Sequence, residues 1–232
     1  TCRNSTEFIS IESVMKRIAF IPARGGSKRL PRKNILPFCG KPMLVHSVEL
    51  AQQSGLFDEV VVSTEDDEIA SIAAEAGARV DHRREDLAGD RNTVIEVCQE
   101  FLQREVHWQQ MVILYAASPL RRLQDINAIV DLLEQGDCDV AMGVSEYSNY
   151  VHQALSYDDN GFAVPVFPQW VAQRSEKIPA MHVSNGSLYG FWCQRFMRQP
   201  TLYPSKLKTH VMPRQFAIDI DTELDLVIAD SV

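Results

Sequence analysis

Basic and small residues gather in one stretch, residues 23–34, with the sequence ARGGSKRLPRKN. The stretch holds five cations, two adjacent glycines and a serine, and it directly follows the apolar run of residues 18–21. Glycines let the backbone approach an anion and adopt a positive φ, so that N–H groups converge on phosphate oxygens, while Lys28 with Arg24 or Arg29 supplies charge. The stretch therefore predicts a polyphosphate site, and a basic surface loop is the alternative.

A second chemical feature lies near the other end of the chain, where Asp219 and Asp221 are separated by one residue. We expect both at the end of a strand, where residues two apart point to the same side. Two carboxylates on one face suit Mg²⁺, which commonly binds one or two carboxylates together with substrate phosphates. Capping of the following helix by Asp221 or Thr222 is the alternative, and the two roles are compatible. With the basic loop, the pair predicts a site for a metal-complexed nucleoside triphosphate and for transfer at phosphorus.

These side chains need a scaffold that brings distant loops together. Apolar, β-branched runs alternate with amphipathic segments, which predicts an α/β, doubly wound fold with a mostly parallel twisted sheet flanked by helices. The expected strands are residues 18–21, 60–64, 79–80, 111–115, 140–144, 187–192 and 209–212, and the expected helices are residues 42–54, 65–76, 93–106, 125–135 and 194–198. We expect Thr64 to cap the second helix and Gly77 to end it. The basic loop then lies at the carboxyl end of the first strand, where such sheets bind ligands.

The alternation breaks between about residues 145 and 185. This segment is rich in aromatic residues and proline and has no long helical pattern, which predicts an inserted hairpin or lid. Its aromatic side chains would form a subunit interface or a substrate wall, and the interface is favoured. We expect residues 15–232 to form a single domain with this insertion, and residues 1–14 to be an upstream extension or a segment added for expression.

The composition narrows the class of protein. With 45% hydrophobic and 23% charged residues, the chain is typical of globular proteins, and its net charge of −8 argues against broad binding to nucleic acid or membrane surfaces. No apolar run approaches the ~18 residues that a membrane span needs, and no signal peptide is evident, so a cytoplasmic location is expected. The five cysteines are scattered, which favours free thiols over a disulfide framework or a zinc site.

The motifs resemble those of one enzyme family. Residues 21–34, the turn at 40–42, the expected strand at 61–64 and the run at 218–225 are similar to the acylneuraminate (CMP-sialic acid synthetase) cytidylyltransferases, which activate nine-carbon α-keto sugar acids. The resemblance covers nearly the whole chain after Met15. The basic loop alone also fits 3-deoxy-manno-octulosonate cytidylyltransferases and other sugar nucleotidyltransferases. The resemblance implies a Rossmann-like nucleotidyltransferase fold, CTP and Mg²⁺, and a homodimer whose insertion reaches into the partner's active site.

The resemblance also implies roles for individual residues. The nucleotide-binding residues it implies are Arg24, Gly25, Gly26, Ser27, Lys28, Asn34, Arg83 and Thr93. Lys28, Arg24 and Asp221 would be catalytic, with Lys28 the foremost cation, and Asp219 and Asp221 would hold Mg²⁺. The anomeric hydroxyl of the sugar would attack the α-phosphate of CTP and release pyrophosphate, while a metal-linked aspartate helps the hydroxyl lose its proton.

The substrate is less closely determined. Sialic acid enzymes usually have Gln-Pro-Thr-Ser-Pro where this chain has Tyr-Ala-Ala-Ser-Pro from Tyr115. The Tyr-Ala start resembles the pseudaminic acid branch, as do Gln153 and Arg174, whereas Asn185-Gly186 resembles the sialic or legionaminic type. We favour a pseudaminic-like acid.

The sugar-binding residues that the resemblance implies are Tyr115, Ser118, Gln153, Arg174 and Asn185. Arg174 would bind the sugar carboxylate through two hydrogen bonds, unless it is a solvated arginine of a mobile insertion. His152 and His182 are pocket donors or structural residues. The rival functions are 3-deoxy-manno-octulosonate cytidylyltransferase and a catalytically silent nucleotide-binding protein.

Overall fold

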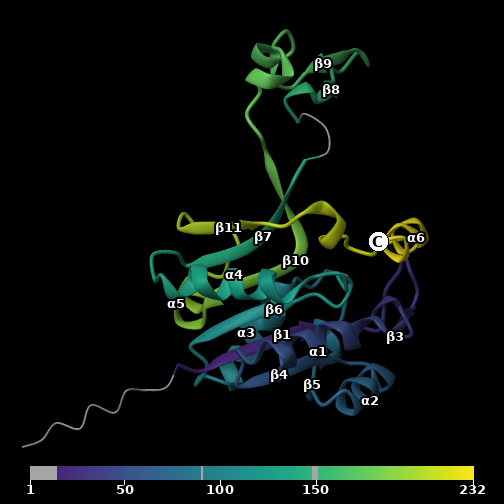
Figure 1. The fold of residues 1–232 in the computed structure, drawn as a ribbon, viewed down its shortest axis with the longest axis vertical. Helices are drawn as coiled ribbons and strands as arrows, with labels where there is room; N and C mark the ends of the chain where they lie inside the picture. Colours follow the sequence, from purple (N-terminus) through teal and green to yellow (C-terminus); the bar gives the residue numbers. More distant parts are fainter. Residues whose placement is uncertain (1–14, 90, 148–150) are drawn as a thin grey trace, which may run out of the picture.

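A seven-stranded sheet forms the centre of the protein. The computed structural model describes residues 15–89, 91–147 and 151–232, so the predicted extension at 1–14 lies outside the described residues. The strands of the sheet are β1 (Arg17–Pro22), β4 (Glu59–Thr64), β5 (Arg79–His82), β6 (Gln110–Leu114), β7 (Val140–Glu146), β10 (His182–Trp192) and β11 (Leu207–Val211). Their order across the sheet is β11-β7-β10-β6-β1-β4-β5 (Figure 1).

The sheet is mostly parallel, as the sequence predicts. β10 alone among its described strands is antiparallel, and it pairs with β6 on one side and β7 on the other. Both β1 and β6 are almost entirely buried apolar runs, because helices cover both faces of the sheet. β1 has β4 on one side and β6 on the other, so the chain changes its direction of travel across the sheet at β1. Open α/β sheets bind ligands beside such a point, outside the carboxyl ends of the strands.

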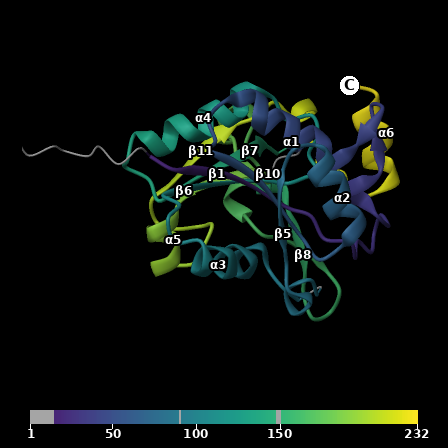
Figure 2. The ribbon, with the colours of Figure 1, turned by 90° about the horizontal axis from the view of Figure 1, so that it is seen from below.

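Helices form a layer on each face of the sheet. The described α-helices are α1 (Met43–Ser54), α2 (Asp67–Glu75), α3 (Val94–Arg104), α4 (Leu123–Glu134), α5 (Cys193–Arg198) and α6 (Glu223–Asp230), of which the first five form these layers. α1, α2 and α4 cover one face and α3 and α5 the other (Figure 2). Each layer has its own core, with Leu44 and Ile126 fully buried in the first and Phe101 in the second. A short hairpin of β2 (Pro37–Phe38) and β3 (Lys41–Pro42) precedes α1.

The ends of α2 test the predicted caps, and α3 shows a cap that was not predicted. Thr93 caps α3, and its Oγ1 accepts a hydrogen bond from the backbone N–H of Glu96. The prediction that Thr64 caps the second helix is wrong, because β4 continues through Thr64 and α2 begins only at Asp67. Asp66 is the cap instead, and its Oδ1 accepts from the N–H of Ile69 at 3.0 Å. Gly77 follows the end of α2 with φ of 84°, which is the left-handed conformation predicted for a helix end.

The predicted insertion forms an arm, which we define as residues 151–181. It carries an antiparallel hairpin of β8 (Leu155–Tyr157) and β9 (Ala163–Pro165), which confirms the predicted hairpin. The extended ends of β7 and β10 lead to it, and it stands away from the body, with β8 and β9 at the far end (Figure 1). The division of the chain into one domain and an insertion stays a prediction.

The state of the cysteines and the length of the helices can be compared with the predictions from composition. The described cysteines, which exclude Cys2, are all free thiols, with Cys39 exposed and Cys98, Cys138 and Cys193 buried. Within residues 15–89, 91–147 and 151–232, none of the helices combines the length and the hydropathy that crossing a membrane requires.

Candidate functional site

A pocket of about 350 Å³ opens where the loops after β1 and β6 meet. Its walls come from the basic loop, the segment before α3, the turn after β6 and the segment before α6. Most of the predicted site residues line it, namely Arg24, Ser27, Lys28, Asn34, Arg83, Thr93, Tyr115, Asp219 and Asp221. The fold therefore brings the basic loop and the acidic pair, which lie near opposite ends of the chain, to one pocket. We call it the donor pocket.

Hydrogen bonds within the protein hold the basic loop in place. The Nδ2 of the buried Asn34 donates to the carbonyl of Arg24 at 2.9 Å, and the N–H of Gly25 donates to Glu65 Oε1 at 2.8 Å. The predicted positive φ is wrong for both Gly25 and Gly26. Gly25 is needed for close packing instead, because a Cβ there would lie 2.4 Å from Oδ2 of Asp66.

The acidic pair does not end a strand, which corrects the prediction. Asp219 and Asp221 lie on an irregular segment after the 3₁₀ turn Arg214–Phe216, because the chain has left the sheet at the end of β11. The segment is tied to the turn after β6 by the N–H of Ile220, which donates to the carbonyl of Ala117 at 2.8 Å. Both aspartates nevertheless line the donor pocket, so the predicted convergence on one side holds.

Asp221 faces the basic loop rather than its own helix. Its two carboxylate oxygens lie 2.7 Å from Lys33 Nζ and 2.6 Å from a guanidinium nitrogen of Arg29. Thr222 is the cap of α6, and its Oγ1 accepts from the N–H of Asp225 at 3.3 Å. The predicted alternatives are thereby separated, since Thr222 caps the helix and the carboxylate of Asp221 is left for the pocket.

Asp219 is a half-buried carboxylate. Burial raises its pKa to about 6, although the positive charge of Lys33 opposes the shift. Its Oδ2 packs against Gly186, where a Cβ would lie only 3.0 Å away. In the part of the chain that the structure describes, no ion pair to Asp219 is found. A cation brought next to this carboxylate would favour its ionised form.

The acidic pair fits Mg²⁺ when substrate phosphates complete the coordination. Among the described residues, no group of three or more His, Cys, Asp or Glu side chains could hold a metal ion by itself. Mg²⁺ needs only one or two carboxylates, since waters and phosphate oxygens supply its other ligands. The desolvated carboxylate of Asp219 suits such a cation, and Asp221 would exchange its contacts with Lys33 and Arg29 for it.

The wall of the donor pocket that carries Arg83, Thr93 and Tyr115 is also fixed by the fold. Arg83 is buried, and its guanidinium donates to the carbonyl of Ser63 at 2.7 Å and to Ser63 Oγ at 3.3 Å. Burial lowers the pKa of this guanidinium. Thr93 lines the pocket although its hydroxyl is engaged in capping α3. Tyr115 is held edge-on against Tyr189, with ring centroids 6.0 Å apart.

Three predicted sugar-binding residues, Ser118, Gln153 and Arg174, are not in the lining of the donor pocket. Ser118 is buried, and its Oγ has no hydrogen-bond partner among residues 15–89, 91–147 and 151–232. Gln153 and Arg174 are exposed on the arm. His152 is a structural residue of the arm, where it is buried against Phe167 and Trp170.

A second pocket of about 640 Å³ adjoins the donor pocket, and Asp219 lines both. Its walls are the bases of the two strands that lead to the arm, the turn before the acidic pair, and α6. Asn185, predicted to bind sugar, is among its residues, together with Gln215 and Arg214. We call it the acceptor pocket. His182, the first residue of β10, is exposed and lines neither pocket.

The structure adds two cations that the sequence interpretation left without a role. Lys33 lines the donor pocket and contacts Asp221, and Arg214 lines the acceptor pocket. Lys33 follows Lys28 by five residues and precedes Asn34, so its place in the basic loop was a signal. Arg214 carries no such signal, because its position depends on how the segment after β11 folds.

Known proteins of three kinds are similar to this chain. N-acylneuraminate cytidylyltransferase of Streptococcus agalactiae is 30% identical over 215 residues, which is 92% of this chain and 52% of that protein. Pseudaminic acid cytidylyltransferase of Campylobacter jejuni is 30% identical over 220 residues, 93% of this chain and 95% of that protein. CMP-N,N'-diacetyllegionaminic acid synthase of Legionella pneumophila is 32% identical over 225 residues, 94% of this chain and 96% of that protein. The chain thus spans about half the length of the streptococcal relative.

The fold and a family profile agree with these relatives. The solved structure of a CMP:2-keto-3-deoxy-manno-octonic acid synthetase complexed with CTP matches with a TM-score of 0.69 at 20% identity, over 94% of this chain and 100% of that one. This match supports the nucleotidyltransferase fold that the resemblance implies. The sequence profile of the family described as cytidylyltransferase matches residues 18–229. The chain therefore belongs to the cytidylyltransferase family.

Proposed function

We propose that this protein transfers the cytidylyl group of CTP to a nine-carbon α-keto sugar acid and releases pyrophosphate. The observation that carries the proposal is that Asp219 lines two adjoining pockets, one faced by the basic loop and the other by Asn185 and Arg214. Transfer at phosphorus needs a donor and an acceptor side by side, with charge neutralisation between them. Relatives named for neuraminic, pseudaminic and legionaminic acids support the class of acceptor.

In this proposal, the triphosphate lies against the basic loop of the donor pocket. Arg24 and Lys28 line the pocket, and Lys33 joins them beside Asp221. Three cations on one side suit the charge that collects on the leaving pyrophosphate. Arg83 and Thr93, on the far wall, would contact the nucleoside.

The acidic pair would act between the two substrates. The oxygen of the sugar hydroxyl forms a bond to the α-phosphorus, the bond from that phosphorus to the bridging oxygen breaks, and pyrophosphate leaves with the electron pair. Asp219 borders both pockets, so its carboxylate is the proposed acceptor of the hydroxyl proton. Asp221 pairs with Lys33 and Arg29 of the basic loop in the protein without substrate. Asp219 and Asp221 would hold Mg²⁺, which would neutralise charge on the phosphate oxygens.

The acceptor pocket would hold the sugar acid. Asn185 and Gln215 offer amide groups for hydroxyl and acylamino substituents, and Arg214 offers a cation for the carboxylate. The three relatives are similarly distant from this chain, so identity does not separate their sugars. We retain a pseudaminic-like acid as the proposed substrate. The reason is that the turn beginning at Tyr115, together with Gln153 and Arg174 on the arm, resembles the pseudaminic acid branch of the family.

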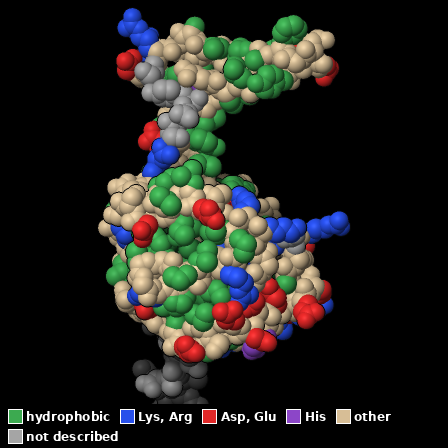
Figure 3. All heavy atoms as spheres, turned by 90° about the vertical axis from the view of Figure 1, so that its right-hand side faces the viewer, with side chains coloured by type: hydrophobic (Ala, Val, Ile, Leu, Met, Phe, Trp, Pro, Cys, Tyr) green, Lys and Arg blue, Asp and Glu red, His purple; other side chains and the backbone are tan. Residues whose placement is uncertain are grey.

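We further propose that the active form is a homodimer. The arm exposes large apolar side chains, including Leu155 at 58%, Tyr157 at 77% and Phe162 at 70% exposure. Hydrophobic side chains cover much of the arm, and more lie on the face of the body below it (Figure 3). Such a surface is typical of a subunit interface. A partner's arm laid over the acceptor pocket would bring Gln153 and Arg174 to the sugar. The cytoplasmic location stays a prediction.

The proposal is tested by incubating the purified protein with CTP, Mg²⁺ and a panel of keto-sugar acids, with pyrophosphate and the CMP-sugar as readouts. We expect product with one or more of the nine-carbon acids and none after chelation of the metal. Product with the eight-carbon acid 3-deoxy-manno-octulosonate alone would support the alternative acceptor. No product with any acid, despite CTP binding, would support a silent nucleotide-binding protein.

A further inference from the structure

Arg121 is a buried cation beside the donor pocket, 3% exposed, and it lines neither pocket. Its Nη1 donates to the carbonyl of Ser187 and lies 3.4 Å from Ser187 Oγ. Its Nη2 donates to Ser47 Oγ at 2.7 Å and to the carbonyl of Tyr115 at 3.0 Å. Among the described residues, its hydrogen bonds go to hydroxyl and carbonyl oxygens and none to a carboxylate.

A guanidinium in this environment is costly to keep. Burial lowers the pKa of Arg121 to about 9, and its Nε has no hydrogen-bond partner in the described part of the chain. The negative charge of Asp125 opposes this shift without a hydrogen bond to Arg121, and an apolar side chain of similar volume is often as stable as a buried charge or more so. A contribution to stability therefore does not explain why a guanidinium occupies this position. Its contacts with backbone carbonyls offer another reason.

The two carbonyls that Arg121 binds belong to the two segments that touch the acidic pair. The first segment is the turn that begins at Tyr115, in which the carbonyl of Ala117 accepts the N–H of Ile220 at 2.8 Å. Ile220 lies between the two aspartates. The second segment is the irregularity in β10, where Gly186, next to Ser187, packs against Oδ2 of Asp219.

We propose that Arg121 is a positioning residue, which sets Asp219 and Asp221 at the spacing needed for the metal-bound nucleotide by clamping the turn after β6 to β10. The inference rests on the proposed function. The clamp acts through backbone, from Arg121 to the carbonyls of Tyr115 and Ser187, and from these segments to Ile220 and Asp219. The hydrogen bonds of Arg121 do not reach the basic loop, which meets the acidic side only where Lys33 and Arg29 contact Asp221, so we expect the clamp to act first on the acidic side.

Arg17 provides the matched control. It is also a buried arginine, 6% exposed, and its guanidinium donates to Gln110 Oε1 at 2.7 Å and to Glu134 Oε1 at 2.7 Å. It begins β1, at the end of the strand opposite to the basic loop, and lines neither pocket. Arg17→Met therefore reports what the loss of a buried, hydrogen-bonded guanidinium does to the whole protein without touching the acidic pair.

The experiment compares Arg121→Met, Arg121→Lys and Arg17→Met with the native protein. Calorimetry measures the affinity for α,β-methylene-CTP, which cannot release pyrophosphate, first with EDTA and then with Mg²⁺. Thermal melting and kcat with the accepted sugar acid are measured in parallel. In the native protein we expect Mg²⁺ to raise the affinity by about tenfold or more, as expected when one charge partner is added.

For Arg121→Met we expect metal-free affinity within about threefold of native, loss of most of the gain from Mg²⁺, and a fall in kcat of ~100-fold. Added guanidinium ion at millimolar concentration should restore part of the gain in affinity from Mg²⁺ and part of the kcat. Arg121→Lys should show the same pattern more weakly, because an ammonium lacks the planar fork that reaches both carbonyls. Arg17→Met should melt at a lower temperature and keep the gain from Mg²⁺.

The inference would be overturned if Mg²⁺ raised the affinity of both Arg121 variants for the CTP analogue as much as it raises that of the native protein. It would also be overturned if the affinity without Mg²⁺ and the affinity with Mg²⁺ fell by the same factor. If Arg121→Met does not fold, Arg121→Lys decides by the same two affinities. The proposed function is judged on the native protein alone. Absence of pyrophosphate release there contradicts the proposed function, whereas a native protein that turns over with insensitive Arg121 variants contradicts only the inference.

Discussion

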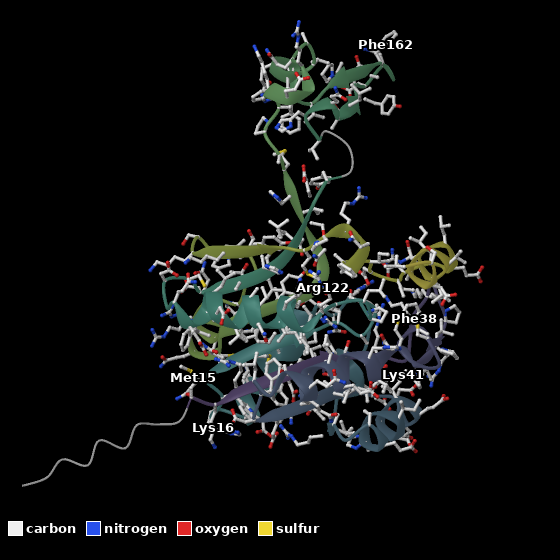
Figure 4. The ribbon with its side chains drawn as sticks, viewed as in Figure 1. Met15, Lys16, Phe38, Lys41, Arg122 and Phe162 are labelled. Atoms are coloured by element: carbon white, nitrogen blue, oxygen red, sulfur yellow. The ribbon has the colours of Figure 1, made fainter. Side chains whose placement is uncertain are left out.

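The donor pocket and the arm differ in how their polar and apolar side chains are held. In the donor pocket, Asn34 and Arg83 are buried and hydrogen-bonded, and Asp221 is paired with two cations. On the arm, Tyr157 and Phe162 are largely exposed, and Phe162 lies at the far end from the body (Figure 4). One chain thus prearranges the groups that would bind CTP, whereas the apolar side chains of the arm are exposed in one chain. If the proposed function holds, we expect a single chain to be competent for nucleotide binding and turnover to require two.

The largest expected effect breaks the donor side. Lys28→Ala and Asp221→Ala should each lower kcat/KM by at least ~100-fold, because each removes a charge partner of the transition state in a partly enclosed site. Steady-state release of pyrophosphate at saturating sugar acid measures the loss. Lys41→Ala is the control, since Lys41 is paired with Glu49 and lines neither pocket. Near-native turnover in either active-site variant would remove that residue from the proposed machinery.

The donor side is also where the sequence was most informative. Buried strands such as β1 are continuous apolar runs, so their positions and the loops at their ends follow from the pattern of the chain. The rule that ligands bind at the carboxyl ends of such strands then predicts that the basic loop borders a pocket, as residues of that loop do. The pairing of Asp221 with Lys33 and Arg29 could not be predicted, because only the tertiary fold brings those segments together.

The arm shows why the remaining predictions failed or stayed open. The break in helical and strand pattern predicted a hairpin correctly. His152 was a candidate donor, and it fills the small core of the arm because Phe167 and Trp170 surround it. Gln153 and Arg174 line neither the donor pocket nor the acceptor pocket of one chain. A sequence pattern predicts which side chains are exposed and gives their chemical type. It does not predict which surface of another segment or chain covers an exposed side chain.

The second prediction concerns how Asp219 of the donor pocket affects the stability of the protein. The pKa of Asp219 is raised to about 6 by burial, so its contribution to stability is complete below its ordinary pKa of 3.8 and is lost as the pH rises through about 6. In EDTA at pH 8, Asp219→Asn should therefore unfold with a free energy roughly 1 to 3 kcal/mol higher than native. The melting temperature would rise by several degrees.

The pH dependence separates this cause from a general effect of the substitution. At pH 4.5 the difference in melting temperature should be much smaller, because the native carboxyl is then largely protonated and uncharged. The same variant should lose turnover at every pH. An equal stabilisation at both pH values would mean that ionisation of Asp219 is not its source.

The third prediction tests whether the arm serves a second chain. Arg174→Ala should lower turnover by about tenfold or more while leaving affinity for the CTP analogue unchanged, because it removes a cation from the sugar and not from the nucleotide. Mixing Arg174→Ala with Asp221→Ala should restore up to about a quarter of native activity. Half of the randomly exchanged dimers are mixed, and each has one site with an intact donor pocket and an intact arm.

The mixing experiment has its own control. Phe162→Asp places a charge on the exposed end of the arm and should weaken association, measured by light scattering. Combined with Arg174→Ala, it should prevent recovery. No recovery from variants that form mixed dimers would show that the arm completes a site in its own chain. Recovery from monomeric variants would show that sharing of the arm between chains is not its source.

The smallest expected effect lies where the two regions meet. Arg214 is exposed, lines the acceptor pocket and is not part of the arm, so it would share the sugar carboxylate with the partner's arm. Arg214→Gln should raise the KM for the sugar acid by about 3- to 10-fold, with little change in kcat or in the KM for CTP. The effect is small because an ion pair that is exposed to solvent contributes little binding energy. Arg198→Gln, an exposed arginine outside both pockets, is the control. The methyl ester of the acid decides the cause, because native and Arg214→Gln proteins should handle it equally if Arg214 acts on the carboxylate. An equal penalty with acid and ester would assign Arg214 to the shape of the pocket and leave the carboxylate to Arg174 alone.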